Sequence, residues 1–152
     1  MADAYQRMGG KGGAGDGMKT ASTATVDIER EWALVKSDAA GSPSWLWCIF
    51  NTESNAYDVL ASGSGGLEAM EAASDPKAIQ FGGVRVEIPG KPRFVHILYV
   101  GPEVSAVKKG KALLLKSAAF NAMTGASGEI AISHARELKE KLEELTGCSD
   151  VD

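Results

Sequence analysis

The chain has 152 residues, of which 44% are hydrophobic and 24% are charged, and its net charge at pH 7 is −4. A chain of this length can bury roughly two-thirds of its unfolded surface, so we expect one compact core. No apolar stretch approaches the ~20 residues of a membrane span, and the first residues lack the apolar segment of a secretory signal. We therefore expect a cytoplasmic protein and exclude a membrane protein.

Residues 1–22 are rich in glycine and offer almost nothing apolar to bury, which predicts a disordered tail. Within it, Gly10-x-Gly12-x-x-Gly15 matches the nucleotide-binding glycine motif by spacing. That motif requires a strand before it and a helix after it, and we expect neither. The expected folded domain spans residues 23–146, followed by a short flexible tail at 147–152.

From Thr25 onward, Ile28, Trp32 and Val35 recur at helical spacing and predict an amphipathic helix. Apolar residues at 45–50 and alternating residues at 57–61 predict two strands joined by a short polar turn, that is, a hairpin. A short helix is expected at 67–73, before the Ser74-Asp75-Pro76 stop.

Residues 78–88 predict a third strand, with a bulge at the Gly82-Gly83 pair, and residues 93–100 predict a central fourth strand. A long helix is expected at 104–124, then a short strand at 130–132 and a final helix from 133 to 146. A strand, helix, strand sequence implies a parallel crossover. The expected order is α-ββ-α-ββ-α-β-α, an α/β domain with a mixed five-stranded sheet and helices on both faces.

Basic residues concentrate in one part of this acidic chain. Between Arg85 and Lys116 there are seven bases and two acids, a local balance of +5, whereas residues 129–152 have a balance of −4. The bases are Arg85, Lys91, Arg93, Lys108, Lys109, Lys111 and Lys116. With an apolar stripe expected through Val104, Val107, Leu114 and Ala118, the lysines of the long helix should point outward. Such a cluster favours an acidic macromolecular partner.

Residues for catalysis or metal binding are few. Cys48 and Cys148 are 100 positions apart, and neither these nor His96 and His134 have the spacing of zinc ligands. We expect no metal and no cofactor, with Cys48 in the core. No serine hydrolase motif is present, and Ala112 follows Gly110-Lys111 where a phosphate loop requires Ser or Thr.

One enzymatic alternative remains open at this stage. The run from Val107 to Leu114, with Lys108, Lys109, Gly110 and Lys111, resembles the phosphate-cradling loop of acyl-CoA-dependent N-acetyltransferases and follows a strand. Val107, however, stands where those enzymes carry Gln or Arg. A further alternative is a general adaptor for acidic partners or anionic lipids.

Residues from about 25 to 145 resemble the actin-depolymerising factor homology domain, and within that family its coactosin-like branch. The matching stretches are Ile28–Asp38, Trp45–Phe50 and, most closely, Arg93–Lys111, with a basic-Phe strand, a glycine turn, Val-Ser and a basic helix start. Each stretch alone is moderately specific, but their joint order over some 120 residues is hard to produce by chance.

The resemblance implies a non-catalytic protein that binds along actin filaments and modulates their dynamics without strong severing. It places the filament contact on the hairpin, at Arg93 with Lys91 nearby, and on the helix start, at Lys108, Lys109 and Lys111. From the charge count we add Arg85 and Lys116. We expect a monomer associated with the actin cytoskeleton, with anionic phosphoinositide lipids as a second candidate partner and no nucleic acid partner.

Overall fold

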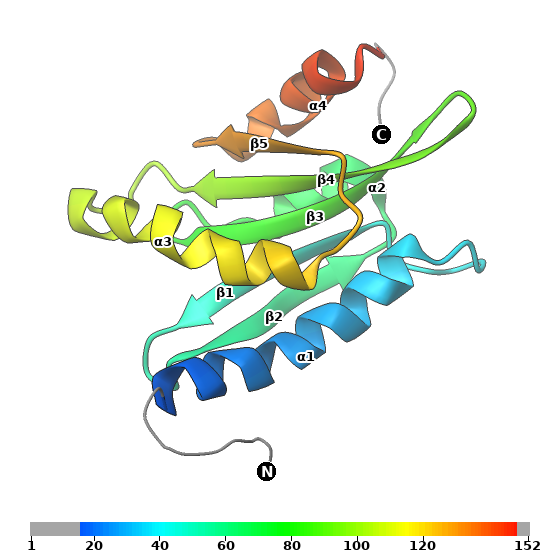
Figure 1. The fold of residues 1–152 in the computed structure, drawn as a ribbon. Coiled ribbons are helices and arrows are strands. Elements are labelled where there is room, and N and C mark those ends of the chain that lie inside the picture. Colours follow the sequence, from blue (N-terminus) through cyan, green and yellow to red (C-terminus); the bar gives the residue numbers. More distant parts are fainter. Residues whose placement is uncertain (1–15, 149–152) are drawn as a thin grey trace.

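The computed structural model describes residues 16–148, with side chains from Thr25 onward. A five-stranded sheet lies between two pairs of helices (Figure 1). The elements are α1 (Asp16–Lys36), β1 (Trp45–Asn51), β2 (Ala56–Gly63), α2 (Gly66–Ala72), β3 (Ile79–Ile88), β4 (Lys91–Val100), α3 (Ala106–Ala122), β5 (Gly128–Ile132), a 3₁₀ turn η1 (Ala135–Glu137) and α4 (Leu138–Thr146).

The strands lie in the order β2-β1-β3-β4-β5. The first three neighbouring pairs are antiparallel, and β4 and β5 are parallel because α3 connects them by a crossover. The expected element order and mixed sheet are confirmed. The 45–51 and 56–63 strands form the expected hairpin, since Asn51 pairs with Ala56.

Each face of the sheet is covered by its own hydrophobic core. The helices α1 and α3 cover one face, where Ile28, Trp32 and Val35 are buried as their spacing predicts. The helices α2 and α4 cover the other face, over Trp45 and Trp47. Cys48 is fully buried, and burial raises the pKa of its thiol to about 12, which makes it an inert core residue at neutral pH.

The Gly82-Gly83 pair does not form the expected bulge, and it accommodates two tryptophan rings. Pairing of β3 with β4 is continuous from Ile79 to Ile88, so the predicted bulge is wrong. A Cβ at Gly82 would lie 2.6 Å from a ring carbon of Trp47, and one at Gly83 would lie 2.5 Å from a ring carbon of Trp32. The two glycines therefore make room for one indole on each face of the sheet. A register shift lies between β1 and β2 instead: Trp47 pairs with Ala61 and Cys48 with Val59, so Leu60 of β2 is the extra residue.

The first helix is longer than its apolar pattern predicts. It begins at Asp16 rather than near Thr25, so the helix includes residues 16–22 of the segment expected to be a tail. Helix formation there does not require an apolar face, because residues such as Met, Lys and Ala have favourable propensities and extend an existing helix one hydrogen bond at a time. The remainder of the expected tail, including the Gly10-x-Gly12-x-x-Gly15 motif, lies outside the described residues.

Candidate partner-binding surfaces

The basic residues between Arg85 and Lys116 do not form one surface, and five of them form two separate clusters. Lys91 and Arg93, here called the hairpin cluster, lie at the start of β4, and Lys108, Lys109 and Lys111, the helix-start cluster, follow its other end. Ten residues of extended strand separate the two ends by about 30 Å. Helix α3 then runs back along β4, as Figure 1 shows, so only its C-terminal end approaches the hairpin.

The hairpin cluster projects at a tight turn. Gly90 has a φ of +101°, a conformation that favours glycine, and it places Lys91 at the exposed start of β4. Arg93 is half-buried, and its Nε donates a hydrogen bond of 3.0 Å to Oγ of Ser127. That bond uses one of five guanidinium N–H donors and fixes the side chain. Neither residue has an ion-pair partner among the side chains of residues 25–148.

The helix-start cluster lies in the first turns of α3. Ser105 caps the helix, with its side chain accepting a hydrogen bond from the backbone N–H of Lys108. No acidic residue occupies the first turn, and within the described part of the chain none of the three lysines has an ion-pair partner. Because a helix N-terminus is itself positive, three cations here add to the dipole and favour an anionic partner.

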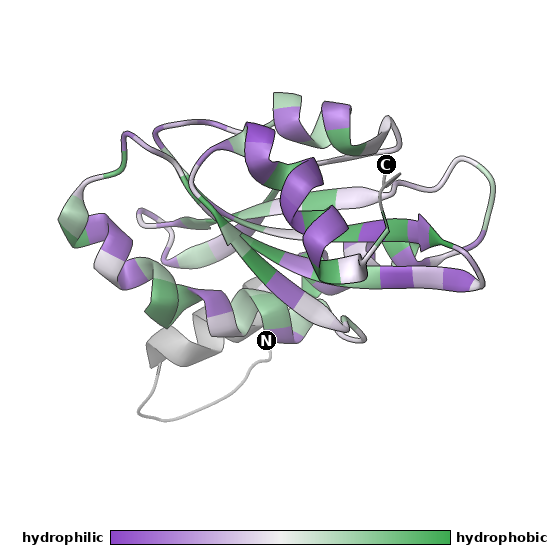
Figure 2. Cartoon of the chain, turned by 90° about the horizontal axis from the view of Figure 1, so that it is seen from above, coloured by the Kyte–Doolittle hydropathy of each residue, from purple (hydrophilic) through white to green (hydrophobic). Residues whose placement is uncertain are grey.

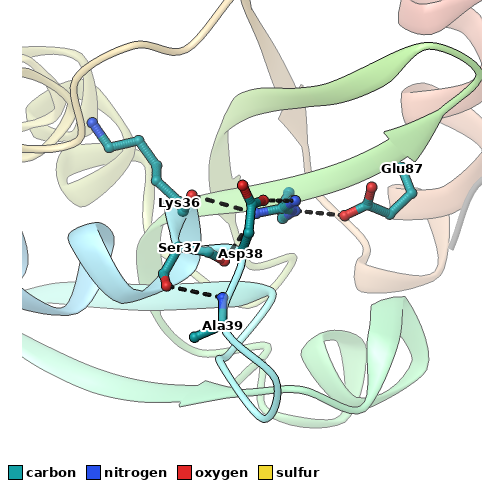
Figure 3. Close-up of polar contacts among 6 residues, drawn as sticks. Lys36, Ser37, Asp38, Ala39 and Glu87 are labelled. Atoms are coloured by element: carbon teal, nitrogen blue, oxygen red, sulfur yellow. Dashed lines mark hydrogen bonds and ion pairs between the residues drawn. The ribbon is translucent and has the colours of Figure 1, made fainter.

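Arg85 is held within the fold and is poorly placed for a partner. Its side chain is only 14% exposed and lies between Asp38, 2.6 Å away, and Glu87, 2.5 Å away. The same guanidinium donates hydrogen bonds to the carbonyls of Lys36 and Ser37, at the end of α1 (Figure 3). Hydrogen bonds with Asp38 and then Glu87 raise its pKa. Arg85 thus ties β3 to the end of α1, a role that its sequence position among the bases did not reveal.

Lys116 is also paired. Its Nζ lies 2.6 Å from Oε2 of Glu129 on β5, so this lysine links α3 to the edge strand. Of the seven bases expected to face a partner, five have no ion pair with any side chain of residues 25–148 and lie in two clusters, and the other two form contacts between elements.

The outward face of α3 is apolar rather than basic. Val107 is 72% exposed, Leu113 62% and Leu114 81%, whereas the helix buries small residues and Phe120. The expected core stripe through Val107 and Leu114 is therefore wrong. Figure 2 shows hydrophobic and hydrophilic residues mixed in the first turns of α3, which extend beyond the sheet. We name Val107, Leu113 and Leu114 the exposed apolar stripe.

The structure does not form the phosphate-binding loop that the acyl-transfer alternative requires. Lys108 to Leu114 lie within α3 itself, not in a loop before a helix, so their backbone amides are hydrogen-bonded along the helix and mostly unavailable to a pyrophosphate.

Among residues 16–148 no three His, Cys, Asp or Glu side chains are grouped as metal ligands require. No helix in that part of the chain has the length and apolarity to cross a membrane.

Comparison with known proteins places the chain in a family. Residues 21–144 match the family model of the cofilin/tropomyosin-type actin-binding proteins, and the chain belongs to this family. Its members are actin-binding proteins and not enzymes, as the resemblance implied, and no comparison supports acyl transfer. A search of curated protein sequences returns no match.

Solved structures of the same fold include coactosins. Coactosin from Entamoeba histolytica superimposes with a TM-score of 0.68 at 24% identity, covering 79% of this chain and 88% of that one. Human coactosin-like protein gives 0.70 at 18% identity, with 84% and 96% covered. Cofilin from Streptomyces griseoflavus gives 0.66 at 15% identity, with 82% and 95% covered. At these identities the likeness establishes the fold.

Proposed function

We propose that this protein binds along the side of actin filaments through the hairpin cluster and the helix-start cluster, and modulates filament dynamics without strong severing. The observation that carries the proposal is the pairing pattern of the bases. Of the seven bases between Arg85 and Lys116, five have no acidic partner among residues 25–148, although the chain as a whole is acidic and places acids beside Arg85 and Lys116. Unpaired cations on an acidic protein favour an acidic partner.

The distance between the clusters supports an extended partner. Two cationic surfaces about 30 Å apart, at opposite ends of β4, can be engaged together only by a surface at least that long. Engaging both surfaces at once raises affinity beyond that of either alone, because the second contact becomes intramolecular. A filament offers such a surface, and coactosin from mouse is described as an actin filament binding protein.

The exposed apolar stripe gives the helix-start cluster the composition of an interface. Val107 and Leu114 are seven residues apart and therefore in line along α3, with Lys111 beside that line and Lys109 on the far side of the helix. Stable protein interfaces combine an apolar centre with a polar or charged rim. We propose that the stripe packs against actin while the lysines contact acidic residues around it.

Cosedimentation with actin filaments at two salt concentrations tests the proposal. The protein should pellet with filaments, and the bound fraction should fall as salt rises, because screening weakens contacts between exposed charges. Filament length, measured by microscopy in the same samples, should change little. A protein that stays in the supernatant at low salt would contradict the proposal.

Three finer expectations belong to the same proposal: a monomeric state, a place in the cytoplasm at the actin cytoskeleton, and binding of phosphoinositide headgroups. The last is supported by the same unpaired lysines, which can contact phosphates as well as carboxylates. Pelleting with vesicles containing phosphoinositides, compared with neutral vesicles, tests it. Light scattering of the purified protein tests the monomeric state.

A further inference from the structure

An apolar pocket of about 290 Å³ opens beside the start of α3. Its inner wall is hydrophobic and comes from the ends of β1 and β3, from the segment before α3 and from α3 itself: Phe50, Ile79, Phe81, Val104 and Leu115. Phe81 and Val104 belong to the buried part of the molecule, so the pocket reaches the core. Its volume lies at the lower end of the range of ligand pockets.

Three lysines form the charged part of the lining: Lys77, Lys108 and Lys111. All three are exposed, no acidic residue lines the pocket, and no side chain between Thr25 and Cys148 forms an ion pair with them. Lysine can extend its methylene groups over an apolar wall while its ammonium group stays in water. The site therefore joins an apolar interior to a cationic mouth.

The sequence of α3 explains why the pocket is open. Lys108 lies seven residues before Leu115 and therefore in line with it, on the side of the helix that faces the sheet. A large apolar residue at position 108 would fill the mouth of the pocket beside Ile79, whereas the exposed lysine leaves it open. About 100° away around the same turns, Val107 and Leu114 face solvent. The helix start thus places charge toward the sheet and apolar side chains away from it.

The wall on the α3 side is held in position by a hydrogen bond across the fold. The hydroxyl of Tyr57 on β2 donates to the carbonyl of Leu115 at 2.7 Å. Tyr57 itself is buried and packs edge-on against Phe50 and Phe81, with ring centroids 5.0 Å and 6.3 Å away. Two of these rings line the pocket, so its inner wall is preformed and a ligand need not order it.

We propose that this pocket binds a small amphipathic carboxylate, a medium-chain aliphatic acid, with its chain against Phe81 and Ile79 and its carboxylate among the lysines. The complementarity of charge selects an anion, and the apolar interior selects an aliphatic chain. The limited volume favours a free small molecule over a folded protein surface. The pocket shares Lys108 and Lys111 with the helix-start cluster, whereas its apolar interior is separate from the hairpin cluster and the exposed apolar stripe, and its test requires no actin.

Titration of the full chain with decanoate, below its micelle concentration, tests the proposal by calorimetry and amide NMR shifts. The shifts should centre on Ile79, Phe81 and Leu115. From hexanoate to decanoate, affinity should rise by up to about fourfold per added methylene until the pocket is full. Decylammonium, which has the same chain and the opposite charge, should bind more weakly.

Matched variants separate this site from general charge attraction. The double variant Lys108→Gln with Lys111→Gln should weaken decanoate binding about tenfold. The control Lys109→Gln with Lys139→Gln removes the same charge from exposed positions outside the pocket, and should change affinity less than about twofold.

Three outcomes would overturn the proposal: shifts located elsewhere, equal binding of decanoate and decylammonium, or equal effects of the two double variants. A peptide ending in leucine, with a free terminal carboxylate, offers the same chemistry from a protein chain. If that peptide binds this pocket more tightly than decanoate does, the occupant is a chain end and the small-molecule assignment is wrong.

Discussion

Two arginines eight positions apart, Arg85 and Arg93, differ in what surrounds their guanidinium groups. Arg85 lies between two carboxylates and donates to the last carbonyls of α1, whereas Arg93 has one hydroxyl partner, Ser127. A cation at the end of a helix interacts favourably with the helix dipole. The first residue therefore stabilises the fold, and the second retains donors for a partner.

Replacing Arg85 by alanine should lower the free energy of unfolding by about 1–2 kcal/mol, because the carbonyls of Lys36 and Ser37 lose their donor. Denaturant unfolding measures the change, with Lys91→Ala as the exposed control that should leave stability unaltered. The Arg85→Ala protein, where folded, should pellet with filaments like the parent. Normal stability combined with lost filament binding would reverse the assignment.

The carboxylate of Glu137 leads to a prediction on how the stability of the fold depends on pH. Its side chain accepts hydrogen bonds from the backbone N–H groups of His134 and Ser133, which lower its pKa. A carboxyl group with a lowered folded-state pKa adds stability above its unfolded pKa of about 4.3, and that contribution is lost as pH falls through the folded value. Glu137→Gln should therefore destabilise most near neutral pH.

The stability difference between Glu137→Gln and the parent, measured by denaturant unfolding from pH 7 to pH 3, should shrink as the pH falls. Glu144→Gln on α4 is the control, because the closest ion pair of the Glu144 carboxylate within residues 25–148 is a 3.9 Å contact with Lys141. A difference that stays constant over this range would show that the hydrogen bonds of the Glu137 carboxylate do not depend on its charge.

At the scale of elements, the two indole rings that pack on β3 explain its glycines. Trp47 lies over Gly82 and donates its indole N–H to the carbonyl of Met70, while Trp32 lies over Gly83 and donates to the carbonyl of Thr124. The Trp47 indole thereby joins the sheet to α2, and the Trp32 indole joins α1 to the segment that follows α3. The close approach of ring to backbone explains why glycine occupies both positions.

Gly83→Ala should destabilise the domain by about 1–3 kcal/mol, because the new methyl group would meet the ring of Trp32 in a packed core. The same substitution at Gly110, on the solvent side of α3 with nothing within 4 Å of the added methyl group, serves as the control. Thermal and denaturant unfolding of both variants measures the difference. Equal stability of the two would show that β3 shifts freely under the indole.

Gly110→Ala should itself stabilise the protein, by about 0.5–1 kcal/mol, since alanine favours a helix interior more than glycine does. The gain should appear in denaturant unfolding and in amide exchange of the first turns of α3. A loss of stability would indicate that α3 needs the freedom of glycine at its start.

The strands could be predicted from the sequence because period-two alternation and short continuous apolar runs between turn residues are typical of strands. The orientation of α3 could not. Between Val107 and Leu115, apolar residues and lysines occur all around the helix, so periodicity alone does not distinguish the buried side from the exposed one. Only the sheet shows that Ala112 and Phe120 face the core while Leu114 faces solvent.

At the scale of the whole molecule, closeness in sequence is a poor guide to closeness in space. The run from Arg85 to Lys116 is a single basic stretch in the chain, but β4 is extended and carries its two ends about 30 Å apart. Acids distant in sequence, Asp38 and Glu129, then engage two of the bases. The candidate residues could be named from the sequence, whereas their division into two clusters required the fold.

The most direct test of filament binding through these clusters is cosedimentation of Arg93→Glu with actin filaments, beside the control Arg136→Glu, which makes the same change at an exposed position on η1. Circular dichroism should first show both variants folded. Arg93→Glu should lose at least ~1.4 kcal/mol, about tenfold in affinity, and its residual binding should depend less steeply on salt. Arg136→Glu should bind like the parent. Equal binding of folded Arg93→Glu and the parent would contradict the account.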